Sequence, residues 1–180
     1  MSLFTDIQLK LAKLSLKRAS KIDREIQAIN LKNASTLGIV YEASNNEAVQ
    51  LVKRYVKFLR EYKIKVLALG YIDEKELPVD VNPSLEFDYI TKKELNLLLE
   101  PKSTVTKNFV EDQFDILIDL SAKENIVLQY LVAQSKAKFK VGAESLSYSS
   151  LFDLTIVLKP DEGIRQLMKN IDRYLHVIKN

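Results

Sequence analysis

The amino-acid sequence predicts an α/β protein whose sheet is mainly parallel and has about five strands. The clearest indication is the run from Phe114 to Gly142, which reads as a buried strand, a short amphipathic helix and a second strand that ends at a glycine. Strand, helix and strand within about thirty residues form the repeating unit of a parallel sheet. The alternation continues through residues 34–180. We therefore expect helices on both faces of the sheet, in a three-layer Rossmann-like domain.

The individual elements follow from hydrophobic periodicity and from the positions of turn residues. Strands are predicted at residues 36–41, 64–71, 114–120, 137–141 and 152–158, and residues 87–90 fit a short additional one. Helices are predicted at residues 45–62, 123–135 and after Pro160, with shorter helical segments at 91–99 and 106–113. The continuous apolar strands predict burial between helix layers for Ile39, Val40, Val66, Leu67, Ile116, Leu117 and Ile118.

Before this domain, residues 1–33 predict one long basic amphipathic helix, because residues 2–31 contain no Gly or Pro and favour helix throughout. At 100° per residue its main apolar stripe comprises Leu3, Phe4, Ile7, Leu11, Leu14, Ile22, Ile26 and Ile29. Leu9 and Leu16 lie nearly opposite that stripe. Residues 1–32 hold seven basic and three acidic side chains, so all of the net charge of +3 lies in this segment.

Three interpretations of this helix stay open. The helix packs on its own domain with solvated lysines, or it forms a homodimer through Leu9 and Leu16, or it docks on anionic lipid or nucleic acid. Nucleic acid is not favoured, because the lysines have no arginine cluster and no interleaved aromatic residues. A membrane is not favoured as a partner of this helix either. We expect the stripe of Phe4, Ile7, Leu11 and Leu14 to be incompletely covered by the domain, and the dimer to run through the leucines.

The composition excludes several chemistries. The chain of 180 residues has no cysteine and one histidine, His176, which excludes disulfides, thiolate nucleophiles, Cys-ligated zinc and, in practice, a catalytic triad or a multi-histidine metal site. No apolar run approaches the roughly twenty residues that span a bilayer. The absence of cysteine fits a reducing compartment, so we expect a cytoplasmic location.

Candidate ligand-binding residues follow two of the strands. Open parallel sheets bind ligands at the carboxyl ends of their strands, where the winding direction reverses. With a strand order of 3-2-1-4-5, one crevice would be lined by Glu42, Ser44, Asn45, Asn46, Asp119 and Ser121. The structural alternative is that Ser44 and Ser121 only cap helices, because Ser44–Glu47 and Ser121–Glu124 both match the S-x-x-E capping box.

The predicted crevice does not favour phosphate. The chain has no G-x-G-x-x-G and no P-loop motif, and Glu42 and Asp119 would repel an anion. Acceptor-rich turns suit the hydroxyl groups of a sugar or ribose, or a cation. We predict no cofactor and no metal site, and the sequence leaves the ligand and the catalytic residues unassigned.

The whole chain resembles an uncharacterised family of small bacterial proteins with a Rossmann-like domain. The resemblance is carried by residues 114–121, FDILIDLS, and residues 135–142, SKAKFKVG. These two stretches are also similar to the N-terminal domain of heptosyltransferase-like glycosyltransferases, in which a D-hydrophobic-I-D-L strand is followed by a helix and a strand ending in glycine. That similarity implies a Rossmann-like fold. Those enzymes bind the nucleotide sugar mainly through a second domain, for which this chain has no room.

The sequence leaves the function unknown and whether the chain is an enzyme open. We expect a non-catalytic binding or interaction module. The alternatives are a small glycosyltransferase-like enzyme or its relic, which binds a sugar or nucleotide at the carboxyl edge of the sheet, and a peripheral membrane or nucleic-acid binder that uses the basic helix.

Overall fold

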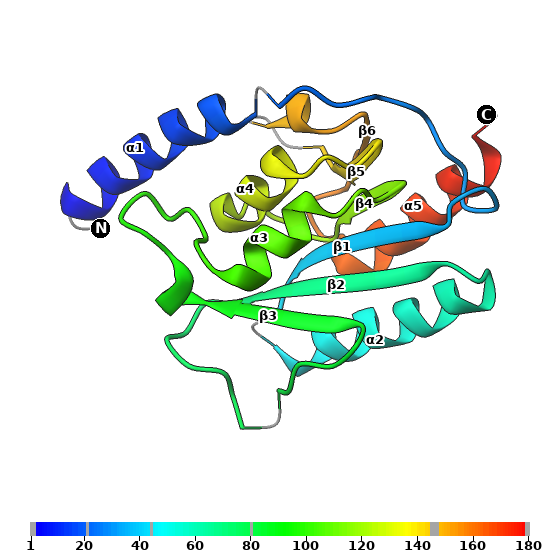
Figure 1. The fold of residues 1–180 in the computed structure, drawn as a ribbon, viewed down its shortest axis with the longest axis horizontal. Helices are drawn as coiled ribbons and strands as arrows, with labels where there is room; N and C mark the ends of the chain where they lie inside the picture. Colours follow the sequence, from blue (N-terminus) through cyan, green and yellow to red (C-terminus); the bar gives the residue numbers. More distant parts are fainter. Residues whose placement is uncertain (1–2, 21, 44, 80, 145–147, 179–180) are drawn as a thin grey trace.

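The protein is built on one parallel sheet (Figure 1). A computed structural model describes residues 3–20, 22–43, 45–79, 81–144 and 148–178. Its six strands lie in the order β3-β2-β1-β4-β5-β6, and every neighbouring pair is parallel. The strands are β1 (Thr36–Glu42), β2 (Lys65–Ile72), β3 (Phe87–Thr91), β4 (Ile116–Asp119), β5 (Phe139–Ala143) and β6 (Leu154–Ile156). The predicted α/β class and parallel sheet are confirmed, with six strands instead of about five.

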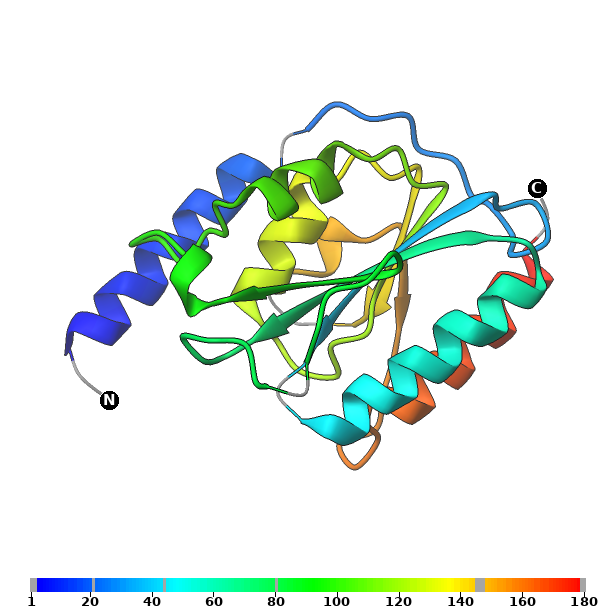
Figure 2. The same ribbon diagram turned by 60° about the horizontal axis from the view of Figure 1, so that its bottom comes forward.

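Helices cover both faces of the sheet (Figures 1 and 2). They are α1 (Leu3–Ala19), α2 (Asn46–Glu61), α3 (Thr104–Glu111), α4 (Ile126–Gln134) and α5 (Ile164–Val177), with short 3₁₀ helices η1 (Lys92–Glu94) and η2 (Ser149–Leu151). Helices α2 and α5 lie side by side and share one apolar core with the sheet, whereas α1, α3 and α4 share the core on the other face.

Strand burial explains why the sheet is parallel. Ile39, Val40, Ile116, Leu117 and Ile118 are fully buried, because helices cover the side chains that point to either face. Val66 is buried as predicted and Leu67 is half-buried. The winding direction reverses at β1, which pairs with β2 on one side and β4 on the other. The carboxyl ends of these three strands therefore meet at the switch point of the sheet.

The prediction of one long N-terminal helix over residues 1–33 is wrong beyond Ala19. Helix α1 ends at Ala19, and residues 22–30 run without helix along the amino edge of the sheet. Tertiary contacts override helix propensity there. Gln27 N–H donates to Lys138 O at 3.1 Å and Leu31 N–H donates to Leu175 O at 3.0 Å, while Ile29 and Leu31 are buried in the core under α5.

Two smaller differences concern the predicted helices. The segment predicted as helix at residues 91–99 is only a 3₁₀ turn, η1, followed by a loop. Helix α4 begins at Ile126, three residues later than predicted, because Asn125 caps it. Both differences reshape the carboxyl edge of the sheet, where the loop and the start of α4 face each other.

Candidate functional site

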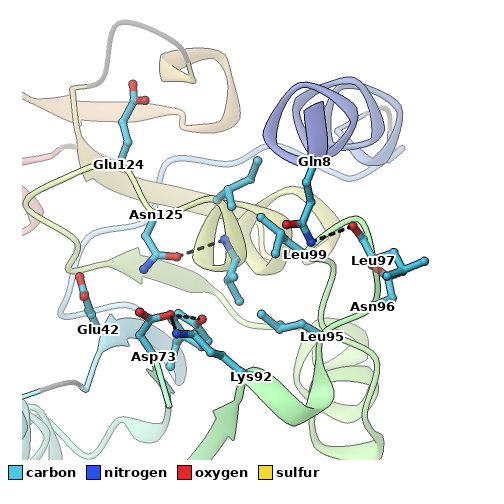
Figure 3. Close-up of a pocket in the computed structure, with 13 residues that line it drawn as sticks. Gln8, Glu42, Asp73, Lys92, Leu95, Asn96, Leu97, Leu99, Glu124 and Asn125 are labelled. Carbon is cyan, nitrogen blue, oxygen red and sulfur yellow. Dashed lines mark hydrogen bonds and ion pairs between the residues drawn. The ribbon is translucent and has the colours of Figure 1, made fainter. Parts of the chain in front are cut away.

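The carboxyl edge of the sheet carries a pocket of about 820 Å³ at the switch point (Figure 3). The ends of β1 and β2, the segment after β3, the start of α4 and one residue of α1 form its walls. Its lining residues are Gln8, Glu42, Tyr71, Asp73, Lys92, Leu95, Asn96, Leu97, Leu99, Glu124, Asn125, Ile126 and Val127. We refer to it as the switch-point pocket. Its position is the one at which open α/β sheets bind ligands.

The structure divides five of the six predicted site residues among three hollows. Glu42 lines the switch-point pocket. Asn45 and Asn46 line a second hollow of about 370 Å³ beside α2. Asp119 and Ser121 line a third, of about 150 Å³, between the ends of β4 and β5. Ser44 lies outside the described residues. The single crevice predicted from the sequence is therefore wrong as a grouping, because Asn45 and Asn46 face one hollow, Asp119 and Ser121 face another, and neither pair lines the pocket that contains Glu42.

The floor of the switch-point pocket is acidic. The Tyr71 hydroxyl donates to Asp73 Oδ1 at 2.8 Å, and Lys92 Nζ lies 3.1 Å from the same oxygen. Glu42, at the end of the neighbouring strand, faces this group (Figure 3). Burial, the hydrogen bond to Asp73 and the charges of Asp73 and Glu42 hold the pKa of Tyr71 above its ordinary value. Tyr71 is therefore a neutral hydrogen-bonding group at physiological pH.

Helix α4 contributes its capped N-terminus to the opposite wall. Asn125 Oδ1 accepts from the backbone N–H of Val127 at 3.1 Å and of Leu128 at 3.4 Å. This cap uses the amides that would otherwise bind an anion. The amide nitrogen of Asn125 turns toward the side of the pocket where Glu42 and Asp73 lie, whereas the Glu124 carboxylate points away from them (Figure 3).

A compact loop between η1 and α3 forms the third wall. Asn96 Oδ1 accepts from the backbone N–H of Leu98 at 2.8 Å and of Glu100 at 3.1 Å. Leu99 has a φ of 59°, a left-handed conformation that is uncommon for leucine and costs energy. Gln8 Nε2 donates to Leu97 O at 3.2 Å and so joins α1 to this loop. These contacts fix the rim of the pocket.

Asn45 caps helix α2. Asn45 Oδ1 accepts from Ala48 N–H at 2.8 Å. Asn46 Oδ1 accepts from Gln50 Nε2 at 3.3 Å, one helical turn further on. Both predicted site residues at this turn therefore use a side-chain oxygen to stabilise the helix in which they lie.

Ser121 is not a helix cap, because α4 begins five residues later. Its backbone N–H donates to Asp119 Oδ1 at 2.8 Å. Asp119 is buried, and this burial raises the pKa of its carboxyl to about 6, an effect that the hydrogen bond from the Ser121 backbone opposes. The Asp119 carboxylate therefore accepts a hydrogen bond within the turn after β4, and it does not reach the switch-point pocket.

His176 lies far from the pocket, as its place near the end of the last helix predicts. Its Nδ1 contacts Asp172 O at 2.7 Å and its Nε2 contacts the Tyr62 hydroxyl at 3.1 Å. Tyr62 follows the last turn of α2, which leads into the amino end of β2. The histidine is thus at the opposite edge of the sheet. Within the described residues, no group of three His, Asp or Glu side chains could hold a metal ion.

Several pocket residues escaped the sequence reasoning, namely Gln8, Asp73, Lys92, Asn96 and Asn125. Asp73 and Lys92 directly follow β2 and β3. The rule that ligands bind at carboxyl ends of strands would have found both, had it been applied to those strands as well as to β1 and β4. Gln8 and Asn96 carried no comparable signal, because their positions depend on the docking of α1 and on an irregular loop.

The family comparison supports one broad statement about this chain. Residues 7–178 match the model of a family of unknown function, DUF6913. The chain belongs to this family. The match spans all six strands and most of α1, so the predicted resemblance to a family without an assigned activity is confirmed. Comparisons with curated proteins and with solved structures gave no match. No similarity to a glycosyltransferase is shown.

Proposed function

We propose that this DUF6913 chain is a non-catalytic binding module whose switch-point pocket takes a small polar ligand rich in hydroxyl or amino groups. The observation that carries the proposal is the excess of acceptors in the pocket. Glu42 and Asp73 line the pocket, and the one cation among its described lining residues, Lys92, has its Nζ 3.1 Å from Asp73 Oδ1. A carboxylate pair of this kind binds hydroxyl and ammonium donors through charge-assisted hydrogen bonds.

The walls complement such a ligand. Asn125 and the hydroxyl of Tyr71 add hydrogen-bonding groups beside the carboxylates, and Gln8 and Asn96 line the opposite side of the pocket. Leu95, Leu99, Ile126 and Val127 supply an apolar wall. Ligand sites commonly combine an apolar lining with a few placed polar groups. A sugar, an amino sugar or a short polyamine has this mixture of donors and apolar CH surface.

Phosphate-bearing ligands fit less well. Asn125 occupies the amides of Val127 and Leu128 in the first turn of α4, and the nearby carboxylates repel a phosphate. The turn after β1 contains no glycine, so its backbone cannot approach a pyrophosphate closely. These features argue against a nucleotide sugar, the donor substrate of the transferase alternative. Tyr71, with its raised pKa, is also a poor general base at neutral pH.

The proposal also places the module in the reducing cytoplasm, with which a chain without cysteine is compatible.

Ligand-dependent thermal stability tests this function. The panel consists of a neutral sugar, an amino sugar, spermidine, a nucleotide sugar and inorganic phosphate. We expect the amino sugar or spermidine to raise the melting temperature, because a ligand that binds the folded state stabilises it. Glu42→Gln and Asp73→Asn should abolish the increase. Glu61→Gln, at the exposed end of α2, is the matched control and should keep it.

Three outcomes would overturn the proposal. The first is stabilisation by the nucleotide sugar or phosphate alone. The second is an increase that survives both pocket substitutions. The third is no response across the whole panel. Release of a free sugar or of nucleoside diphosphate from the nucleotide sugar would favour the transferase alternative instead.

A further inference from the structure

Helix α1 carries three large apolar side chains on its outward side. Ile7, Leu11 and Leu14 are 50%, 49% and 60% exposed, and their spacing aligns them along one face. Ala12 and Leu16, on the opposite face, are 0% and 1% exposed and pack toward α4. The expected incomplete cover of the stripe is thus confirmed for these three residues, and the predicted interface through Leu16 is wrong, because the domain itself buries that side chain. Leu9 is half-buried.

The helix is fixed in this orientation. The buried hydroxyl of Tyr130 in α4 donates to Ala12 O at 2.8 Å. The contact between Gln8 and Leu97 O holds the same helix on the loop after η1. Turning the stripe inward would break both contacts. The second contact also places the Leu97 backbone beside the helix, and the Leu97 side chain is 81% exposed.

Basic side chains border the stripe along one flank. Lys10, Lys13 and Lys17 are exposed, and none of the ion pairs in the described part of the chain involves them. A hollow of about 480 Å³ lies on this flank, lined by Lys10, Lys13, Leu14, Lys17 and Tyr148. Residues 1–32 carry an excess of four positive charges, whereas the remainder of the chain has a net charge of −1.

We infer that α1 docks the protein on an anionic lipid membrane surface, with the helix in the plane of the interface. Ile7, Leu11 and Leu14 enter the boundary between headgroups and acyl chains, and the lysines contact anionic headgroups at the rim. A helix of this kind binds through its apolar area and its attraction to anionic lipids. No helix in the described part of the chain is long and apolar enough to cross a bilayer. This inference is independent of the ligand proposed for the switch-point pocket.

Charge distinguishes a lipid surface from a second copy of the chain. An antiparallel pair of α1 helices, stripe against stripe about a two-fold axis, would set each lysine flank against the other. Like charges on the facing flanks repel, and Asp6 is the only acidic residue that helix α1 itself sets against Lys10, Lys13 and Lys17. An anionic bilayer presents the complementary charge over the whole flank. An acidic protein would too, and the experiment separates these occupants.

The chain contains no tryptophan, so one introduced residue reports on the stripe alone. Leu11→Trp places the reporter in the stripe, and Leu85→Trp, at a position 96% exposed between β2 and β3, is the control. With vesicles of phosphatidylcholine and about 30 mol% phosphatidylserine, we expect the Leu11→Trp emission to shift to the blue and the Leu85→Trp emission to stay unchanged. Phosphatidylcholine alone should give little shift, and about 1 M salt should reverse it.

Co-sedimentation with the same vesicles tests which side chains of α1 contribute to membrane binding. Changing Ile7, Leu11 and Leu14 together to Gln, or Lys10, Lys13 and Lys17 together to Gln, should each weaken binding at least about tenfold. Val79→Gln with Leu85→Gln, both fully exposed elsewhere, should leave it unchanged. Equal far-ultraviolet circular dichroism shows that the variants are folded. The inference is overturned if the wild type does not sediment with vesicles, if it binds polyglutamate instead, or if light scattering shows a dimer that the Ile7, Leu11 and Leu14 variant disrupts.

Discussion

The buried hydroxyl of Tyr130 in α4 donates to the carbonyl oxygen of Ala12 in α1 across 2.8 Å. This bond joins the N-terminal helix to α4 on the face of α1 that the domain covers. Ala12 and Leu16 consequently point inward, and Leu14 points to solvent with 60% of its surface exposed. The pocket contact of Gln8 depends on the same orientation, because Gln8 belongs to this helix.

Two leucines of α1 should therefore differ sharply in their contribution to stability. Leu16→Ala should lower the free energy of unfolding by about 2–5 kcal/mol, because it leaves a cavity beneath the helix. Leu14→Ala, an equal change on the outward face, should stay within about 0.5 kcal/mol of the wild type. Urea unfolding followed by circular dichroism measures both. Similar losses for the two variants would show that α1 is docked through another face.

Arg24 should hold the segment after α1 to the sheet. Its guanidinium lies 2.6 Å from Asp153 Oδ1 and also donates to Ala137 O and Lys138 O, and both charged side chains are only 12% exposed. Arg24→Met should cost about 3–5 kcal/mol, because it leaves a buried carboxylate without its partner. Lys93→Met breaks an ion pair of similar length at the surface and should cost less than about 1 kcal/mol. A small loss for Arg24→Met in urea unfolding would contradict this role.

Lys140 makes stability depend on pH. Its ammonium is buried and donates to Val132 O at 2.6 Å, with Arg24 and Asp153 close by. Burial, and secondarily the charge of Arg24, lowers its pKa from 10.5 to about 7. Between these values the unfolded chain binds the extra proton, so stability rises with pH from about 7 toward 10, by at most about 1.4 kcal/mol per pH unit.

Urea unfolding at several pH values between about 6.5 and 9.5 tests this dependence, which Lys140→Met should flatten. Lys136→Met, which removes an exposed lysine, should leave the slope of the wild type unchanged. Equal slopes for the wild type and Lys140→Met would mean that Lys140 keeps an ordinary pKa in the folded protein.

Asn125 should stabilise α4, and Ser121 should not. Asn125→Ala removes the acceptor of two backbone N–H groups and should cost about 1 kcal/mol. Ser121→Ala keeps the backbone hydrogen bond to Asp119 and should change stability by less than about 0.5 kcal/mol. The reverse order in denaturant unfolding would restore the capping box that the sequence predicts at Ser121.

A helix or strand was predictable from the sequence where the apolar residues of its periodic pattern are the ones that the fold buries. This holds for β4, α2 and α5, each of which buries the apolar residues of its pattern. Residues 22–31 have the same helical pattern, yet Arg24 and Ile29 find better partners at Asp153 and in the core under α5. No local signal distinguishes these two cases, because the deciding partners lie more than a hundred residues away in sequence.

The location of the candidate site was predictable from the sequence, but most of the residues that line it were not. The switch-point rule led to Glu42, which lines the pocket. Asn45 comes after β1 and Asp119 is the last residue of β4, but Asn45 caps α2 and Asp119 is buried and bonded within its own turn. Which way a side chain points after a strand depends on the loop that packs against it, and the loop from Leu95 to Glu100 has no repeating pattern to read.

The most direct test of the proposed binding site follows the side-chain amide resonances of the chain during a titration with an amino sugar or spermidine. Gln8, Asn96 and Asn125 line the switch-point pocket, whereas Asn45 and Asn46 line the neighbouring hollow and serve as internal controls. We predict saturable shifts for the first three and none for the other two. Shifts confined to Asn45 and Asn46, or no shift at any of the five, would contradict the assignment of the switch-point pocket as the binding site.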